Sequence, residues 1–258
     1  MESSMSCCQM IKFSLSKLVM EFTGTLILTM FFCISSVGPQ AILLLGLWIT
    51  NIFFWKISGS HFNPAVTFAF IFRRDERKMH WKLAIAYIVA QLAGGYVGAL
   101  LQNFYTLDMP ELSFNGGFFL RALCQELLVS FFYVFFFMSN TDEKLLFSNE
   151  KAINCFILAC SYVGARAIFY GNSTVATLNY GAVANPAIAI GICMSTLFNE
   201  GFGAWNSIYL YPTIPFGGAI LAVFFYELVY KKTQAFLAHE DGDSNVSDSR
   251  DDSMGEHD

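Results

Sequence analysis

Long apolar runs separated by short polar connections make up most of this chain. Six of these runs are long enough to cross a hydrocarbon layer ~30 Å thick as helices. They cover roughly residues 18–37, 38–57, 83–104, 118–138, 152–171 and 207–230. Two other apolar segments, Val66 to Phe72 and Ile188 to Leu197, are too short to cross and indicate half-helices. The pattern predicts an all-α membrane protein with six crossing helices and two re-entrant half-helices.

The same tripeptide begins both half-helices. The two copies are Asn63-Pro64-Ala65 and Asn185-Pro186-Ala187. Asn is a favoured helix N-cap, and Pro is favoured at the first helical position, where its missing N–H is not needed. A helix that stops at mid-depth leaves backbone groups unpaired, which is tolerated only along a watery cavity walled by protein. We therefore expect the two helix starts to meet inside the protein.

Composition supports a membrane protein. Charged residues make up 14% of the chain and hydrophobic residues 55%, whereas an ordinary soluble domain has about 25% charged residues. A soluble helical bundle is therefore a poor alternative. The basic residues form short clusters and no continuous stripe, so nucleic-acid binding is excluded. Eight of the twenty acidic residues lie in the last nineteen positions, and the acidic segment 233–258 is predicted to be a disordered cytosolic tail.

The basic residues predict an orientation. The segments on one side of the predicted spans carry nearly all the Lys and Arg residues, whereas the loops at 35–40, 105–117 and 172–184 carry none. The basic set is Lys12, Lys17, Lys56, Arg73, Arg74, Arg77, Lys78, Lys82, Lys144, Lys151, Lys231 and Lys232. The positive-inside rule then places both termini in the cytosol.

An internal repeat divides the membrane domain. A glutamate, Glu21 or Glu126, lies in the first span of each three-span half. We expect a cytosolic N-terminal segment at 1–13 and a channel domain at 14–232. The domain's repeats are at about 14–104 and about 118–232. Halves with an odd number of spans are inverted relative to one another, and sites in such proteins lie near the midplane at the repeat interface.

These features together resemble the aquaporin, or major intrinsic protein, family over residues 14–232. The motifs are Ser58-Gly-Ser-His-Phe-Asn-Pro-Ala-Val-Thr67, Gly181 to Gly191, and Pro215-Phe-Gly-Gly-Ala219. The resemblance implies a passive channel in the lipid bilayer for water and small neutral solutes such as glycerol, urea or hydrogen peroxide. It also implies a homotetramer with one pore per subunit and no cofactor. Small residues at Gly94, Gly95 and Gly98 permit close helix contact, consistent with such an assembly.

The two Asn side chains are the first candidate pore residues. Facing helix N-termini each concentrate roughly half a positive charge, which repels cations, while the amides of Asn63 and Asn185 can donate to a passing oxygen. The alternative role for these residues is helix capping alone. The resemblance implies that Glu21 and Glu126 accept hydrogen bonds from the re-entrant loops and support them, and a proton relay is the alternative. His61 resembles the family's loop histidine, either neutral and bonded to backbone or sensitive to pH.

The outer filter departs from the family pattern. Common members carry Arg directly after the second Asn-Pro-Ala, and this chain has Ile188. The other candidate filter positions are Leu43 or Leu45, Asn172 or Ser173, and Ala182. This set predicts a wider and more apolar filter.

Arg166 complicates that prediction. It precedes the candidates Asn172 and Ser173 by six or seven residues, close to two helical turns. It either replaces the missing filter charge or pairs with a Glu or with carbonyls away from the pore.

Other functional classes have less support. The chain has no nucleophile–base pair and no metal-ligand cluster, so an enzyme or a metal site is not expected. A non-conducting membrane protein that keeps the fold for adhesion or structure remains the main alternative. The missing filter Arg and the bulky Phe62, Phe68 and Phe70 near the first half-helix motivate it.

Overall fold

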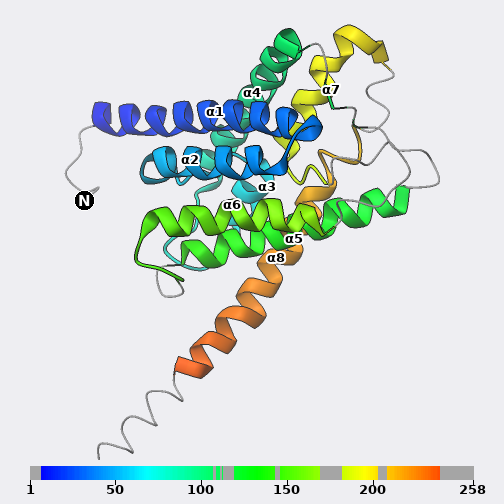
Figure 1. Cartoon of the computed structure of the whole chain (residues 1–258). Coiled ribbons are helices and arrows are strands. Elements are labelled where there is room, and N and C mark those ends of the chain that lie inside the picture. Colours follow the sequence, from blue (N-terminus) through cyan, green and yellow to red (C-terminus); the bar gives the residue numbers. More distant parts are fainter. Residues whose placement is uncertain are drawn as a thin grey trace, which may run out of the picture.

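Helices form all the regular structure in the part of the chain that the computed structural model describes. The described residues are 7–106, 109–110, 112, 119–142, 146–168, 182–202 and 208–238. The helices are α1 (Cys7–Val37), α2 (Gln40–Ser58), α3 (Pro64–Ile71), α4 (Trp81–Thr106), α5 (Phe119–Thr141), α6 (Lys151–Ala167), α7 (Pro186–Glu200) and α8 (Ile214–Phe225) (Figure 1). A π-helical segment, Tyr226–Tyr230, follows α8, and the helix then continues to residue 238.

The predicted spans and half-helices correspond to these helices with small shifts. Five described helices are long and apolar enough to cross a membrane, namely the helices at Phe13–Ser36, Gln40–Ser58, Trp81–Thr106, Phe119–Thr141 and Ile214–Ala238. α6 has only 17 residues and ends at Ala167, so it is shorter than the predicted span at 152–171. The end of that span lies outside the described residues. The predicted tail at 233–258 also needs correction, because residues 233–238 are helical.

The helices pack as two halves, and each half-helix packs against a helix of the opposite half. In the first half α1 packs against α2 and α4, and in the second half α5 packs against α6 and α8. The half-helix α3 packs against α8, and the half-helix α7 packs against α4, so each completes the opposite half. This exchange brings the N-termini of α3 and α7 toward each other in the interior (Figure 1).

Glycines in α4 allow its closest helix crossings. Gly94 and Gly98 face the backbone of α1 at Phe22 and Leu26. Gly95 faces the backbone of Ala187 in α7 and leaves no room for a Cβ atom. The close helix contact that the sequence predicted at these glycines is confirmed, and the contacts are with helices of the same chain.

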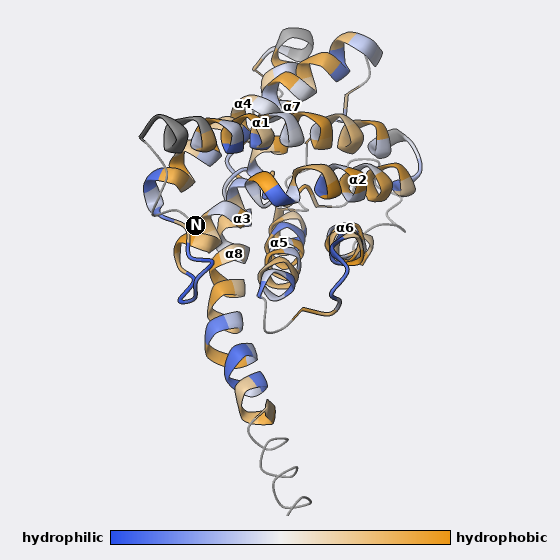
Figure 2. Cartoon of the chain, turned by 90° about the vertical axis from the view of Figure 1, so that its left-hand side faces the viewer, coloured by the Kyte–Doolittle hydropathy of each residue, from blue (hydrophilic) through white to orange (hydrophobic). Residues whose placement is uncertain are grey.

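Polarity is reversed relative to a water-soluble bundle. Large apolar side chains are exposed on the outside, such as Phe53 on α2, Val89 on α4 and Phe224 on α8, and Figure 2 shows that hydrophobic residues make up much of each helix. Acidic and amide side chains are buried instead, among them Glu21 and Glu126. The helix that continues beyond the π-helical segment after α8 projects away from the remaining helices (Figures 1 and 2).

The basic side chains expected on one side gather at one end of the bundle. A cavity of about 360 Å³ at this end is lined by Lys17, Lys56, Arg77 and Lys78. We call it the basic end. It includes the start of α1, the end of α2, the loop before α4 and the end of α5.

Candidate functional site

The two Asn residues of the repeated tripeptide cap the half-helices. Asn63 is extended (φ −151°), and its Oδ1 accepts a hydrogen bond from the backbone N–H of Ala65 at 2.8 Å. Asn185 has the same conformation (φ −145°) and accepts from Ala187 at 3.0 Å. The N-cap geometry expected from an Asn-Pro start is therefore present twice.

The same side chains also join the two loops. The amide Nδ2 of Asn63 donates to the carbonyl of Ala184 at 2.8 Å, and Nδ2 of Asn185 donates to the carbonyl of Phe62 at 2.9 Å. Each acceptor is the residue directly before the opposite Asn. An Asn amide carries two N–H donors, and among the described residues only one per side chain is used. One donor on each Asn therefore remains for another oxygen.

A rare backbone conformation makes this reciprocal contact geometrically feasible. Phe62 and Ala184 have φ values of 47° and 52°, in the left-handed region that L-residues seldom adopt. Because the backbone turns at these residues, their N–H groups face the carboxylates of Glu21 and Glu126. Their carbonyls face the side-chain amides of the opposite Asn residues. Such strain persists only where surrounding contacts determine it, and it gathers at functional sites.

Two buried carboxylates hold the strained residues. Glu21 accepts hydrogen bonds from the backbone N–H groups of His61 at 3.1 Å and Phe62 at 2.8 Å. Glu126 accepts in the same way from Val183 at 2.6 Å and Ala184 at 2.8 Å. Both carboxylates are fully buried. They supply acceptors to loop backbone that has no other partner inside a membrane.

Sequence reasoning missed two residues of this network. Gln91 of α4 donates from Nε2 to Glu21 and to the hydroxyl of Thr67, both at 2.8 Å. The Thr67 hydroxyl also lies 3.1 Å from Nδ1 of His61, so within the described residues the histidine ring bonds a side chain, where the sequence interpretation expected backbone. The signal was present in the sequence, because a glutamine within an apolar span needs a buried polar partner.

His61 lies at the inner side of the basic-end cavity. Three rings surround it: Phe70 at 4.4 Å, Phe137 at 5.6 Å and Tyr87 at 5.7 Å between centroids. The cavity therefore leads from the basic end to the first loop, two residues from Asn63.

The described filter candidates are buried. Leu43 and Ile188 are 0% exposed and Ala182 is 2% exposed. Leu45 is 54% exposed, which places it on the outer face of α2 and removes it from the candidates. Asn172 and Ser173 lie outside the described residues.

Arg166 is buried near the end of α6. Its guanidinium carbon lies 4.3 Å from the ring centroid of Phe32 and 5.5 Å from that of Tyr162. It also interacts electrostatically with Glu126. The Tyr162 hydroxyl donates to the carbonyl of Val183 at 2.6 Å, so Arg166 lies one helical turn from a residue bound to the second loop. The interaction with Glu126 agrees with the interpretation of Arg166 as a charge paired with a carboxylate, and replacement of the filter charge stays a prediction.

A second buried arginine organises the basic end. Arg73 is 0% exposed and contacts Asp75 at 2.8 Å, Thr141 at 2.7 Å and Tyr226 at 3.2 Å. These contacts tie the loop after α3 to the ends of α5 and α8. Partial burial acts to raise the pKa of the Asp75 carboxyl, but its hydrogen bonds to Arg73 and the charges of Arg73 and Lys231 prevail and lower it to about 2. Sequence reasoning used Arg73 only to assign orientation.

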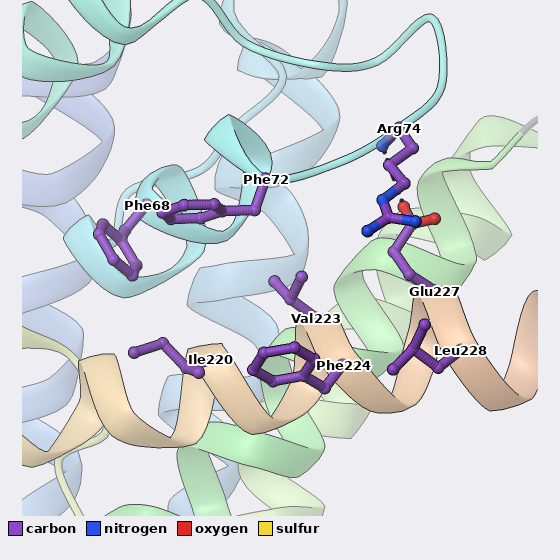
Figure 3. Close-up of a pocket in the computed structure, with 8 residues that line it drawn as sticks. All are labelled: Phe68, Phe72, Arg74, Ile220, Val223, Phe224, Glu227 and Leu228. Carbon is purple, nitrogen blue, oxygen red and sulfur yellow. Dashed lines mark hydrogen bonds between the residues drawn. The ribbon is translucent and has the colours of Figure 1, made fainter.

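A separate groove lies on the outside of the bundle. Figure 3 shows its lining side chains from α3, the following loop, α8 and the π-helical segment. They are Phe68, Phe72, Arg74, Ile220, Val223, Phe224, Glu227 and Leu228. The groove has a volume of about 330 Å³ and shares no lining residue with the basic-end cavity. Four of its apolar side chains are exposed, namely Phe72, Ile220, Phe224 and Leu228.

Known proteins are similar to this chain in sequence. Residues 8–226 match the family described as Major intrinsic protein. Probable aquaporin PIP2-6 of Oryza sativa subsp. japonica is 29% identical over 185 residues, which cover 68% of this chain and 61% of that protein. Probable aquaporin PIP-type 7a of Pisum sativum is 30% identical over 183 residues, with 68% and 60% covered. The chain spans about three fifths of the length of these curated relatives.

A solved structure shows the same fold. The X-ray structure of the aquaglyceroporin from Plasmodium falciparum aligns with a TM-score of 0.67 at 20% identity. The alignment covers 84% of this chain and 97% of that one. With the family match extending through both re-entrant loops, this chain belongs to the major intrinsic protein family of integral, multi-pass membrane channels.

Proposed function

We propose that this protein is a passive channel for water and small neutral solutes, and that Asn63 and Asn185 line its narrowest polar region. The observation that carries this proposal is the reciprocal bonding of the two Asn side chains. It fixes two helix N-termini face to face and leaves one amide donor on each for a passing oxygen. Water, glycerol and urea all carry such an oxygen.

The same geometry supports exclusion of cations. The N-termini of α3 and α7 each present roughly half a positive charge to the same region. A cation there meets two like partial charges and loses hydration, whereas a neutral solute exchanges hydrogen bonds. Glu21 and Glu126 are already occupied by loop backbone, which favours a supporting role over a proton relay.

We propose that Leu43, Ala182, Ile188 and Asn172 or Ser173 form the filter, with Arg166 as its nearest charge. The filter residues that the structure describes have apolar side chains. The filter therefore favours solutes whose hydration shell is removed at a low cost in free energy. Ile188 is central to the proposal because it lies one helical turn past Asn185 on α7.

The proposal is tested by light scattering on proteoliposomes that contain the wild type, Ile188→Arg or Ile188→Val. The wild type should accelerate swelling in glycerol relative to empty vesicles. Ile188→Arg should lower glycerol flux several-fold relative to water flux, because it adds bulk and a charge to an apolar constriction. Ile188→Val keeps the shape and polarity and should retain wild-type fluxes. Unchanged glycerol flux in Ile188→Arg would remove residue 188 from the filter.

A non-conducting structural or adhesion protein is the second candidate function. The burial of Leu43, Ala182 and Ile188 favours it, because an open filter exposes its side chains to water. Permeability of wild-type proteoliposomes equal to that of empty vesicles would select this function.

Assembly and orientation complete the proposal. We propose that the basic end faces the cytosol, since Lys and Arg are retained there, and that the protein forms a homotetramer in the bilayer. The exposed apolar face of α2, which includes Leu45, Ile49 and Phe53, is available for subunit or lipid contact. Cross-linking in native membranes should yield a four-subunit band.

A further inference from the structure

The groove on the outside of the bundle has apolar walls and a charged end. Figure 3 shows Phe68 and Phe72 of α3 across from Phe224 of α8. The rings of Phe68 and Phe72 lie 5.0 Å apart between centroids and form one continuous wall. Arg74 and Glu227 lie together at one end of the groove (Figure 3). The lining therefore combines an apolar surface with charged groups at a single end.

The two ends of the groove lie at different depths of the bundle. α3 begins in the interior, next to the buried Asn63, and its last residue is Ile71. Phe68 therefore lies deeper than Phe72. Arg74 follows in the loop between α3 and α4, which belongs to the basic end. The groove is thus charged at the basic end and apolar toward the middle of the membrane domain, the same order as the headgroup and acyl chains of a phospholipid.

The charges at this end leave Arg74 without an acidic partner. Oε1 of Glu227 accepts from the backbone N–H of Arg74 at 3.1 Å, and Oε2 of Glu227 lies 3.5 Å from Nζ of Lys231. Asp75 pairs with Arg73 and with Lys231. These two acids and two bases balance one another. Within the described part of the chain the guanidinium of Arg74 forms no ion pair, so it offers the groove one uncompensated positive charge.

The apolar wall and this charge together select one class of occupant. A soluble anion would bond Arg74 but leave the wall uncovered. A helix without acidic residues, such as α2, would cover the wall but leave Arg74 unpaired. The groove volume of about 330 Å³ suits a small molecule. An anionic phospholipid satisfies both features, and basic pockets between membrane helices are known to bind such headgroups.

We propose that this groove is a binding site for one anionic phospholipid, with an acyl chain against Phe72 and Phe224 and the phosphate at the guanidinium of Arg74. The guanidinium presents several N–H donors in one plane, which matches phosphate oxygens. Glu227 holds the backbone of Arg74 and so keeps its side chain at the end of the groove. The site is separate from the two re-entrant loops, so it does not depend on the proposed channel function.

The test is native mass spectrometry of the full chain released from micelles with equal amounts of phosphatidylglycerol and phosphatidylcholine that have identical acyl chains. The wild type should retain phosphatidylglycerol in preference to phosphatidylcholine. Arg74→Gln should lower this preference about fivefold, the effect of one basic residue near an anionic membrane surface. The substitution keeps the backbone N–H that bonds Glu227, so the fold should be retained.

Arg121→Gln is the matched control. Arg121 is exposed in the first turn of α5, and the groove has no lining residue from α5. This variant loses the same charged group and should keep the wild-type preference for phosphatidylglycerol.

A second measurement uses the wild type alone and tests the apolar part of the site. Glycerol 3-phosphate, which carries a phosphate but no acyl chain, is added in excess to protein loaded with phosphatidylglycerol. It should not displace the lipid, because it buries no apolar surface in the groove. Displacement would show a phosphate site that does not use the apolar wall, and would overturn the lipid site.

Three other outcomes would also overturn it. Equal retention of the two lipids by the wild type would leave the groove to neutral chains or to another subunit. An unchanged preference in Arg74→Gln would place the recognising charge elsewhere. Equal losses in Arg74→Gln and Arg121→Gln would indicate a general attraction of anionic lipids to basic residues. Water flux tests the proposed channel function separately from all of these results.

Discussion

Phe62 and Ala184 show how single residues determine the geometry of this site. Each has a left-handed backbone that costs roughly 1–2 kcal/mol for an L-residue. Each donates its N–H to a buried carboxylate and accepts, at its carbonyl, a hydrogen bond from the opposite Asn amide. The two residues therefore connect both carboxylates with both Asn side chains, and the strain is offset by four hydrogen bonds.

The carboxylate of Glu126 should be essential for the second loop. Glu126→Gln keeps the shape of the side chain, but one of its two acceptor oxygens becomes a donor that faces a backbone N–H. One buried N–H then lacks a partner, which costs about 1–3 kcal/mol. We expect a lower melting temperature in detergent and reduced water flux.

Glu150→Gln is the control for that substitution, because Glu150 is exposed before α6. A melting temperature for Glu126→Gln equal to that of Glu150→Gln would show that the carboxylate does not hold the loop.

At the scale of elements, the position of α7 depends on its crossing with α4. Gly95 and Gly191 lie on the facing sides of these helices, and each approaches the backbone of the other helix. This close approach sets the depth at which α7 begins, and with it the depth of Asn185. In the other half, α3 packs against α8, whereas Gly218 of α8 faces the backbone of α5 at Leu127.

Gly95→Ala should therefore separate α4 from α7. The added methyl group meets the Ala187 backbone, and overpacking of this kind costs typically 1–3 kcal/mol. The melting temperature and water flux should both decrease. Gly164→Ala in α6 is the matched control, since a Cβ atom there has no neighbour within 4 Å. It should be neutral or raise stability by about 1 kcal/mol. Equal effects of the two substitutions would contradict the crossing as described.

At the scale of the molecule, the basic end joins parts of both halves. Arg73 connects the loop after α3 to Thr141 of α5 and Tyr226 after α8, and Asp75 balances its charge and also contacts Lys231. Loss of this cluster releases the helix ends around the cavity that leads to His61.

Acid should weaken this cluster as the pH falls from 3.8 to about 2. The pKa of Asp75 is lowered from 3.8 to about 2, so the ionised carboxyl stabilises the fold above pH 3.8. This contribution is lost as the pH falls toward 2. Melting temperatures of the wild type should decline over this range more steeply than those of Asp75→Asn, which lacks the titrating group. Parallel pH profiles would exclude Asp75 from the stability of the basic end.

The sequence predicted the parts of this architecture that depend on local chemistry. Repeated Asn-Pro starts and buried glutamates are visible because they are rare within apolar spans. The ring contacts of Tyr133 with Phe137 and Tyr162 were not predicted, because aromatic residues within a span look like ordinary core residues. Arg73 was interpreted only as a topological charge, since its partners on α5 and α8 are distant in sequence. The filter positions counted by offset from Asn185, Asn172 and Ser173, lie outside the described residues and stay a prediction.

Water flux measured together with proton leak tests the central claim most directly. Proteoliposomes with an imposed pH gradient are shrunk in sorbitol while internal pH is followed with a trapped dye. The account predicts shrinkage much faster than that of empty vesicles, with the pH gradient decaying no faster than in those vesicles. Water flux equal to that of empty vesicles, or rapid loss of the gradient, would contradict a neutral-solute conduit held between Asn63 and Asn185.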